Sequence, residues 1–460
     1  MTLKNKTLFK RTNKFGDPQK FNKKYADSDF SQNTILADEV YMGLNNRKRK
    51  NNNVLVIGGS GTGKSRSVIQ PNLLQANCSY VITDVGGTLL KSQRHFLEQK
   101  GYKIKVFDLT DMSKSSHYNP FNYIRDEKDV VTMVDSLIKI TNGGKRSETP
   151  SWEVMEKALL LACCFYLIET VPKEEQNFAN VMELLNAALS AAEITKDDPD
   201  DMSLLDVLMN NLEKNKPESI AVENYKFFKM MDGKSIAAFL IIAGAAVRLQ
   251  VFNFAEVKQL TNDDTLDLIS LGDEKQALFI VLPQNDSNFN FLASMLISQL
   301  INMLKDCIQQ DGVIKPLKTH VSFLLDDFAE LRFISELDSK IDGIKGYNIS
   351  FTIVLQSLSQ LKAMYKDNWE AIVDNCAAFI FFGCRGKTTL KYVENRLKCA
   401  AINACEVGLL KNDYDYNFEF MSYNGAADDC IVFVRGERPI CAKKYNPANH
   451  PNFAKERCIN

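Results

Sequence analysis

One segment restricts the fold of this chain more than any other: Gly58-Gly59-Ser60-Gly61-Thr62-Gly63-Lys64-Ser65. It follows the apolar run 53–57, and the residues after it have a helical pattern as far as Pro71. The pattern G-x4-G-K-S between a strand and a helix is typical of a loop that binds phosphate. Backbone N–H groups turn toward the anion, and the N-terminus of the helix adds partial positive charge. The alternative is a glycine-rich turn that arose by chance. Such a turn would need neither a strand before it nor a helix after it.

The loop also assigns chemical roles to its side chains. Lys64 is expected to reach the β- and γ-phosphates of a nucleotide, and Ser65 to ligate Mg²⁺. The loop predicts ATP and Mg²⁺ as cofactors. The predicted cofactor-binding residues are Gly58, Gly59, Ser60, Gly61, Thr62, Gly63, Lys64 and Ser65.

Short apolar runs, separated by helical patterns, predict an α/β protein with a parallel sheet. From 152 to about 260, apolar residues instead recur at three- and four-residue spacing, which predicts an all-α insertion. We expect a basic N-terminal arm over 1–40, the two parts of an α/β domain over 41–140 and 271–460, and the all-α domain over 141–270. The expected strands lie at 53–57, 79–83, 103–108, 277–282, 320–325, 349–355, 378–382 and 430–434.

Two of these strands end in polar residues that suit nucleotide chemistry. Strand 320–325 runs into Asp326 and Asp327. We expect Asp326 to hold Mg²⁺ and Asp327 to polarise the attacking water; alternatively, both acids cap the next helix. Strand 349–355 ends at Gln356, which either senses the γ-phosphate or caps a helix. The predicted catalytic residues are Lys64, Asp326, Asp327 and Gln356.

The net charge of −1 conceals two opposite regions. Residues 1–50 contain twelve Lys or Arg and five Asp or Glu, whereas 151–270 contain ten basic and twenty acidic residues. This balance excludes a uniformly basic coat for nucleic acid. The arm, expected to be mobile over its first thirty residues, is either a solvated tail or a contact with anionic lipid or the DNA backbone.

Cysteine usage and hydropathy further limit the classes of protein to which this chain can belong. The eleven Cys are scattered without a CxxC pair, which favours reduced thiols over disulfides or a zinc site. We expect no run of the ~18 or more apolar residues that spans a membrane.

Several motifs together resemble the TraG/TraD-type coupling proteins of type IV secretion and conjugation systems, in the branch found in Gram-positive integrative elements. They span about 40–455, much more of the chain than the loop alone. The motifs are Asn53-Val-Leu-Val-Ile-Gly-Gly-Ser-Gly-Thr-Gly-Lys-Ser-Arg66, Gln70-Pro-Asn-Leu-Leu74, Ser79-Tyr-Val-Ile-Thr-Asp84, Gly101-Tyr102, Tyr118-Asn-Pro-Phe121, Leu324-Leu-Asp-Asp-Phe-Ala329, Leu355-Gln-Ser-Leu-Ser-Gln-Leu-Lys362, Asp374-Asn-Cys376, Tyr445 and His450-Pro-Asn452.

The resemblance implies a RecA-like P-loop NTPase domain split by an all-α domain and assembled as a homo-hexamer. It implies an ATPase that recruits or translocates a DNA–relaxase substrate, with single-stranded DNA held through its backbone. The implied partners are the relaxase and secretion-channel proteins. The implied location is cytoplasmic, at the inner face of the cell membrane. The membrane anchor that the family usually carries at its N-terminus is expected to come from a separate protein, from the basic arm, or not at all.

The sequence also departs from the family at three places around the nucleotide. The family pattern Asp-Pro-Lys-Gly-Glu is replaced by Asp84-Val-Gly-Gly-Thr88, and the Glu after the metal-binding Asp is Asp327. The segment 344–348 carries Lys345 where the family has Arg. An alternative is therefore a poorly hydrolysing, nucleotide-gated adaptor that docks relaxase or channel proteins. A third hypothesis is a RecA-like ATPase of DNA segregation.

Overall fold

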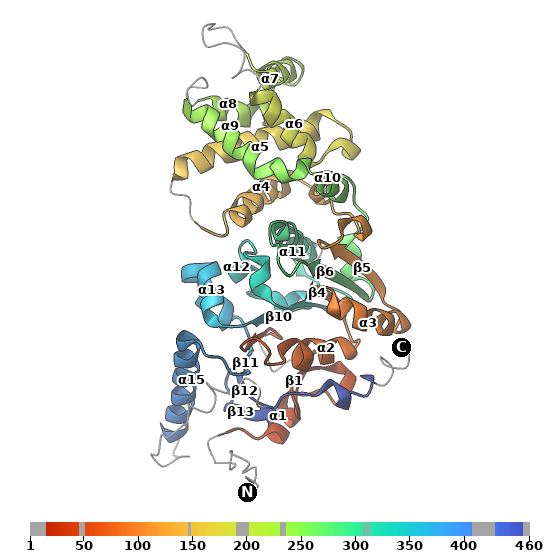
Figure 1. Ribbon diagram of the computed structural model, residues 1–460, viewed down its shortest axis with the longest axis vertical. Helices are drawn as coiled ribbons and strands as arrows, with labels where there is room; N and C mark the ends of the chain where they lie inside the picture. Colours follow the sequence, from red (N-terminus) through yellow and green to blue (C-terminus); the bar gives the residue numbers. More distant parts are fainter. Residues whose placement is uncertain are drawn as a thin grey trace.

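The structure, a computed structural model, describes residues 15–45, 51–145, 149–189, 202–230, 236–306, 309–310, 313–406 and 428–453. The molecule is elongated (Figure 1). A sheet flanked by helices occupies one end, and a cluster of helices occupies the other.

The central sheet has nine strands in the order β13-β12-β11-β3-β10-β9-β4-β6-β5. Only β12 runs against its neighbours, because both β11 and β13 pair with it in antiparallel fashion. The carboxyl ends of β3, β9, β10 and β11 therefore share one edge. The strands are β3 Val54–Ile57, β4 Ser79–Val85, β5 Lys103–Asp108, β6 Gln276–Leu282, β9 Val321–Leu325, β10 Ile349–Leu355, β11 Ala378–Phe381, β12 Asp429–Val434 and β13 Ile440–Lys443.

The middle strands are mostly apolar because both faces of the sheet are covered. All residues of β3 and β10 are buried. Leu55 and Ile57 face the core beneath α11 (Asn290–Asp306) and α13 (Leu358–Tyr365), while Val54 and Val56 face α2 (Gln70–Leu74) and α3 (Thr88–Gln99). The predicted α/β class is confirmed, and all eight expected strands are present.

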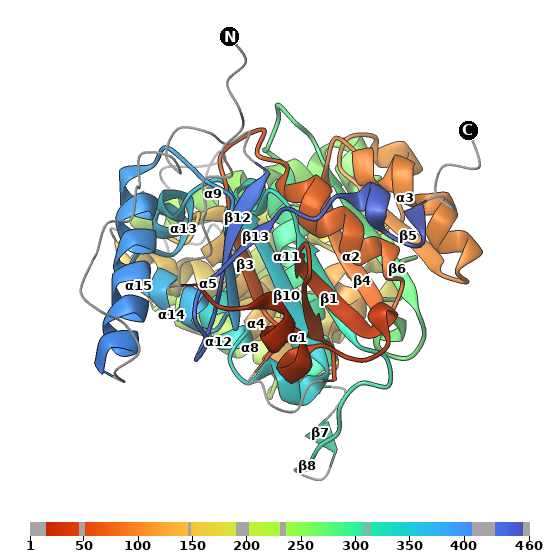
Figure 2. The same ribbon diagram turned by 90° about the horizontal axis from the view of Figure 1, so that it is seen from below.

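Residues 15–45 form a folded unit instead of the mobile arm expected over the first thirty residues. Helix α1 (Pro18–Tyr25) precedes a hairpin of β1 (Asn33–Ala37) and β2 (Val40–Gly43). The unit lies against the β12–β13 end of the sheet (Figure 2), where the Tyr25 hydroxyl donates to Glu437 Oε1 at 2.6 Å. The arm prediction was therefore wrong for residues 15–30; residues 1–14 lie outside the described part.

The other end of the molecule is the helical module, which we define as α5 to α10. In its described residues no strand occurs. Helix α4 (Glu127–Thr141) lies between the module and α11, packing on both α5 and α11 (Figure 1). The module comprises α5 Pro150–Thr170, α6 Phe178–Leu189, α7 Leu204–Asn215, α8 Ile220–Lys229, α9 Ile236–Leu249 and α10 Ala255–Asn262.

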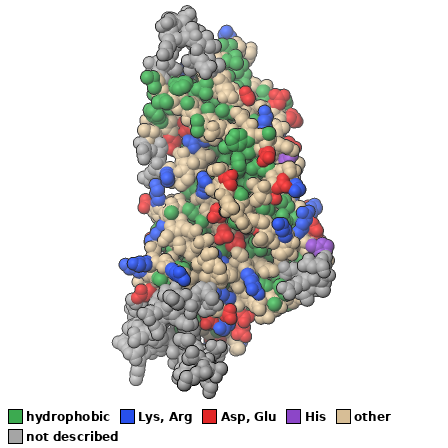
Figure 3. Space-filling view, in the orientation of Figure 1, with side chains coloured by type: hydrophobic (Ala, Val, Ile, Leu, Met, Phe, Trp, Pro, Cys, Tyr) green, Lys and Arg blue, Asp and Glu red, His purple; other side chains and the backbone are tan. Residues whose placement is uncertain are grey.

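Helix α9 corrects the expectation that no segment has the length and hydropathy of a membrane span. The helical stretch Ile236–Asn253 has 18 residues and a mean hydropathy of 1.8, and 33% of it is buried. Its buried side, which includes Ala245 and Leu249, packs on α5 and α6. Its other side leaves Ile236 and Val247 mostly exposed. Hydrophobic side chains gather on the face of the helical module that Figure 3 shows.

The polypeptide enters and leaves the helical module through two adjacent segments, 117–123 and 260–276, which we call the joint. They lie side by side because β5 and β6, which precede and follow the module, are paired strands. Thr265 N donates to the carbonyl of His117 at 3.0 Å, and the Tyr123 hydroxyl donates to Asp264 Oδ1 at 2.7 Å. Asn119 of the Asn-Pro-Phe motif adds a bond from its amide to Asn262 O at 3.2 Å.

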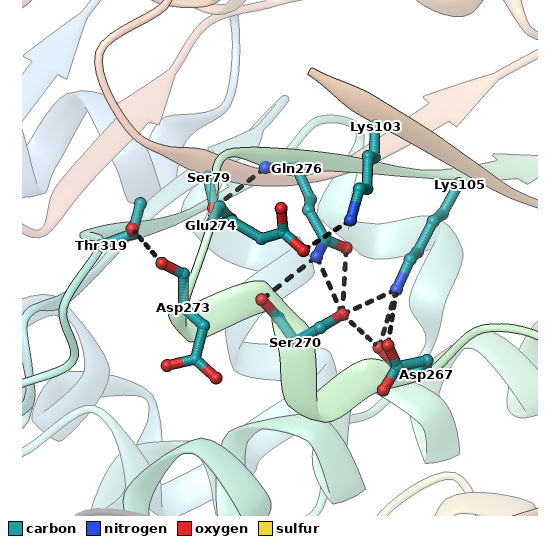
Figure 4. Close-up of polar contacts among 9 residues, drawn as sticks. All are labelled: Ser79, Lys103, Lys105, Asp267, Ser270, Asp273, Glu274, Gln276 and Thr319. Atoms are coloured by element: carbon teal, nitrogen blue, oxygen red, sulfur yellow. Dashed lines mark hydrogen bonds and ion pairs between the residues drawn. The ribbon is translucent and has the colours of Figure 1, made fainter. Parts of the chain in front are cut away.

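Two lysines of β5 fasten the returning segment to the sheet (Figure 4). Lys105 Nζ donates to Asp267 O at 2.7 Å and to Ser270 Oγ at 3.0 Å. Lys103 Nζ pairs with Glu274 at 2.6 Å, and both of these side chains are more than half exposed. The module is thus tied to the sheet by polar contacts on the edge opposite the phosphate-loop motif.

Candidate nucleotide-binding site

The glycine-rich segment forms a tight loop directly after β3. Gly61 and Gly63 have φ of 74° and 83°, a left-handed conformation that favours glycine. At Gly58 a Cβ atom would lie 2.6 Å from Thr62 Oγ1 and 2.7 Å from Phe382 Cβ, so only glycine fits. The loop continues into a helix, the arrangement in which backbone N–H groups bind phosphate.

The helix after the loop does not stop at Pro71, as the sequence predicts, but continues to Leu74. Its first turn, Ser65–Ile69, is a π-helix, in which Gln70 N donates to Ser65 O. Proline lacks the N–H for an α-helical bond and crowds the carbonyl four residues earlier. Pro71 therefore explains the wide turn, and such turns occur frequently at functional sites.

Lys64 lies inside the loop and is only 7% exposed. Its Nζ donates to Gly59 O at 3.0 Å. Burial lowers the pKa of the Lys64 ammonium, and the charges of Asp327 and Asp326 partly oppose that shift. A buried ammonium whose hydrogen-bond partner is a neutral carbonyl is electrostatically suited to receive an anion.

Ser65 and Asp326, predicted from distant parts of the chain to share a magnesium ion, are brought together by the sheet. The register places Leu355 of β10 beside Ile57 and Ile353 beside Leu325, so the loop and the end of β9 share one edge. The Ser65 side chain lies close enough to the Asp326 carboxylate to lower its pKa.

Burial raises the pKa of Asp326 to about 6, and the neighbouring Asp327 charge acts in the same direction. The Ser65 side chain and the charge of Lys64 oppose this shift. Oxygen ligands of this kind are the ones that Mg²⁺ prefers, so the residues present fit that ion. Among the described residues no separate cluster of three or more His, Cys, Asp or Glu could hold a metal.

Asp327 has a left-handed backbone conformation, with φ 42° and ψ 50°. It begins the short turn Phe328–Leu331 without a side-chain capping bond. The alternative interpretation, in which both acids serve as helix caps, therefore finds no support at Asp327. A non-glycine residue in this conformation is strained, and such residues cluster at functional sites.

Gln356 follows β10 at the same edge and is exposed. The cap of α13 is formed by Ser357 together with Gln360, whose Oε1 accepts from the backbone N–H of Gln356 at 2.8 Å. The alternative role for Gln356, capping this helix, is thus taken by its neighbours. Its side chain is available at the edge between the phosphate loop and Asp326.

Two of the departures from the family pattern have a structural account. The Asp84 carboxylate accepts from Leu89 N at 3.1 Å and from Leu90 N at 2.7 Å, so it caps α3. Lys345 lies in the turn before β10, at the amino ends of the strands and away from the loop of its own chain.

Sequence reasoning missed two residues that touch the site. The Thr83 hydroxyl donates to Asp326 O at 2.7 Å and fixes the end of β9. Lys444 Nζ donates to Thr62 O at 3.1 Å. Lys444 follows a short strand that the apolar pattern does not reveal, so only its closeness to the Tyr445 motif signalled it.

Comparison with known proteins decides the family. The sequence profile described as "Type IV secretory system Conjugative DNA transfer" matches residues 7–400. The chain belongs to this family. The finer assignment to a Gram-positive branch has no support from these comparisons.

Curated relatives in the conjugative DNA transfer family are distant in sequence. VirD4 of Rhizobium radiobacter is 23% identical over 85% of this chain and 56% of its own length. A TraG protein of Escherichia coli is 22% identical over 70% of this chain and 51% of its own length. The chain therefore spans about half the length of the curated relatives that it matches.

Solved structures show the same fold. The coupling protein TrwB, in its unbound monoclinic form, superposes with a TM-score of 0.65 at 17% identity, over 94% of each chain. VirB4 of Thermoanaerobacter pseudethanolicus gives a TM-score of 0.51 at 14% identity, over 91% of this chain and 97% of its own. The predicted RecA-like P-loop NTPase fold is confirmed by the TrwB likeness.

Proposed function

We propose that this chain binds ATP with Mg²⁺ and hydrolyses it to recruit or translocate a DNA–relaxase substrate in a conjugative type IV secretion system. One observation carries the proposal. The Ser65 hydroxyl meets the Asp326 carboxylate beside the buried Lys64, in a chain of the conjugative DNA transfer family. Solved structures of TrwB with ADP and Mg²⁺ and with an ATP analogue support it.

Each predicted site residue has a distinct role in this proposal. Ser65 and Asp326 would hold Mg²⁺, which would supply positive charge to the phosphates. Residues 58–64 wrap the phosphates, with Lys64 contacting the β- and γ-phosphates. Asp327 accepts a proton from the attacking water, and Gln356 lies beside the terminal phosphate.

The experiment is an ATPase assay of the purified chain with and without single-stranded DNA. We expect turnover that rises with DNA and is lost in Lys64→Ala. Lys91→Ala, which changes an exposed lysine of α3, is the matched control and is expected to keep wild-type turnover. Binding of ATP by the wild type without turnover in the presence of DNA would overturn the motor function.

A nucleotide-gated adaptor is the second candidate, favoured by the same local chemistry. The acid after Asp326 is the shorter Asp327, the segment 85–88 lacks the Lys and Glu of the family pattern, and Lys345 stands where the family has Arg. Loss of an arginine finger costs about 10³–10⁵ in rate where one is used. Capture of purified relaxase that requires ATP but not its hydrolysis would support the adaptor.

The proposal extends to organisation and location. We assign a basic arm to 1–40, the nucleotide-binding domain to 41–140 and 271–460, and the all-α domain to 141–270. A homo-hexamer on the cytoplasmic side of the membrane would act with secretion-channel proteins. Mass photometry with and without ATP tests the oligomer, and co-sedimentation with vesicles tests membrane association.

A further inference from the structure

The C-terminal strand brings a second lysine to the phosphate loop. β13 is antiparallel to β12, which is antiparallel to β11, so β13 runs in the same direction as β11 and β3. Its carboxyl end therefore lies at the edge of the sheet where the loop follows β3. Lys444 comes directly after β13, at that edge.

The side chain of Lys444 passes over Phe382 to reach the loop. Its Nζ lies 5.0 Å from the centroid of the Phe382 ring and donates to Thr62 O at 3.1 Å. Phe382 is also the residue that excludes a Cβ atom at Gly58. The lysine is thus held against the loop by an aromatic face on one side and a backbone carbonyl on the other.

The charge of Lys444 is not balanced by an ion pair with any residue that the structure describes. Lys443, by contrast, pairs with Asp429 at 2.7 Å. Burial lowers the pKa of Lys444, the charges of Asp428 and Asp429 oppose that shift, and the Lys64 charge adds a smaller lowering. Both ammonium groups bond to carbonyls of the same loop. Two partly buried cations flanking one loop raise the local positive potential, which a polyphosphate would neutralise.

We propose that Lys444 is a second phosphate-binding lysine of this site, which contacts the α- and β-phosphates of the bound nucleotide. The inference rests on the proposed function. The acids that serve the terminal phosphate, Asp326 and Asp327, follow β9 on one side of β3. Lys444 approaches from the β11 side, where the inner phosphates lie when the terminal phosphate faces the acids.

This placement gives Lys444 a signature that Lys64 lacks. The α- and β-phosphates are common to ATP and ADP, so removing the Lys444 charge weakens both by the same factor. A charge-assisted hydrogen bond of about 1.5 kcal/mol corresponds to a roughly tenfold change in the dissociation constant. In steady state the change appears in KM, with kcat little affected.

The test measures ATP and ADP affinity by titration calorimetry in Lys444→Met, which keeps the aliphatic stem over Phe382. Lys443→Met, at the adjacent position, is the matched control. We expect about tenfold weaker binding of both nucleotides in Lys444→Met, wild-type affinity in Lys443→Met, and affinity close to wild type in Lys444→Arg. Thermal unfolding without nucleotide checks that each variant is folded.

Three results would overturn the inference. They are wild-type affinity in Lys444→Met, a loss confined to ATP, and an equal loss in Lys444→Arg. A loss confined to ATP would place the ammonium at the terminal phosphate. An equal loss in Lys444→Arg would show that the side chain has a structural role. A wild-type chain that binds neither nucleotide would instead reject the proposed function, so the two failures are distinguishable.

Discussion

The Ser65 side chain lies close enough to the Asp326 carboxylate to lower its pKa, although the two residues come from opposite halves of the chain. The contact exists because β10 is the one strand between β3 and β9, so the residues beyond β3 and β9 approach each other over its end. It holds two oxygen ligands together in a buried setting. Its consequences for pH, turnover and stability can be measured.

The first prediction concerns pH. Because the pKa of Asp326 is raised to about 6, protons compete with Mg²⁺ for this carboxylate below about pH 6. The Mg²⁺-dependent gain in ATP affinity should fall as the pH drops through that value and level off above it. Titration calorimetry over this range tests it. Asp326→Asn should lose both the gain and its pH dependence, and a flat wild-type profile would contradict the prediction.

The same pKa shift predicts the effect on stability. The folded state keeps a proton on Asp326 between pH 3.8 and about 6 that the unfolded state releases, so this contribution to stability falls as the pH rises through that window. Asp326→Asn should therefore unfold with a free energy about 2 kcal/mol higher than wild type near neutral pH. Urea denaturation measures it, and the gain should shrink toward about pH 4.

A substitution at Asp327 should change ATP turnover without changing ATP binding. Asp327→Asn removes the proton acceptor but keeps a side chain that tolerates the left-handed backbone. We expect ATP affinity within about twofold of wild type, and turnover lower by about 10²–10⁴. Steady-state kinetics together with nucleotide titration test this. Unchanged turnover would remove Asp327 from the mechanism.

Asp327→Glu restores the longer acid of the family. If the shorter acid limits the site, this variant turns over ATP faster than wild type. A lower melting temperature is expected beside the faster rate, because Glu is less tolerant of positive φ than Asp. A rate at or below that of the wild type would show that the reach of Asp327 is not limiting.

Gln356 and Gln360 form a matched pair on the same turn. Gln356→Ala should lower DNA-stimulated turnover with little effect on ATP affinity or on melting temperature. Gln360→Ala removes half of the capping box, so it should destabilise the fold by about 1 kcal/mol and leave turnover of the folded protein intact. The reverse pattern would assign the structural role to Gln356.

Lys105 and Lys103 form a second matched pair at the joint. Lys105→Met removes two hydrogen bonds from a side chain that is only 14% exposed and should lower the free energy of unfolding by about 1 kcal/mol. Lys103→Met breaks an exposed ion pair and should change it by little. Urea denaturation at matched ionic strength compares them. Equal effects would show that the joint does not depend on Lys105.

The parts of the fold that follow from a pattern in consecutive residues could be predicted from the sequence. Both faces of β3 and β10 are covered, so their residues are mostly apolar and the two segments are recognisable as strands. The motif at Gly58–Ser65 is local, and the acids stand directly after their strand. The candidate site was accordingly predictable in its residues, although their assigned roles stay predictions.

Other features depend on contacts that no local pattern records. β13 has only four residues, and its burial is mixed because it is an edge strand, so it was missed together with Lys444. The unit 15–45 packs Phe21, Leu36 and Met42 into a core shared with the sheet, and its Tyr25 bonds to Glu437, which is distant in the sequence. The helix through Pro71 survives by widening its first turn, which a rule that ends helices at proline does not anticipate.

The adjacency of β5 and β6 has a consequence for how such proteins diversify. The helical module connects β5 to β6, which are neighbouring parallel strands. A single crossover helix could make the same connection. A different helical cassette, entering at residue 117 and leaving at residue 276, would preserve every strand pairing and the phosphate loop. The helical module could therefore be replaced while the sheet and the phosphate loop stay unchanged.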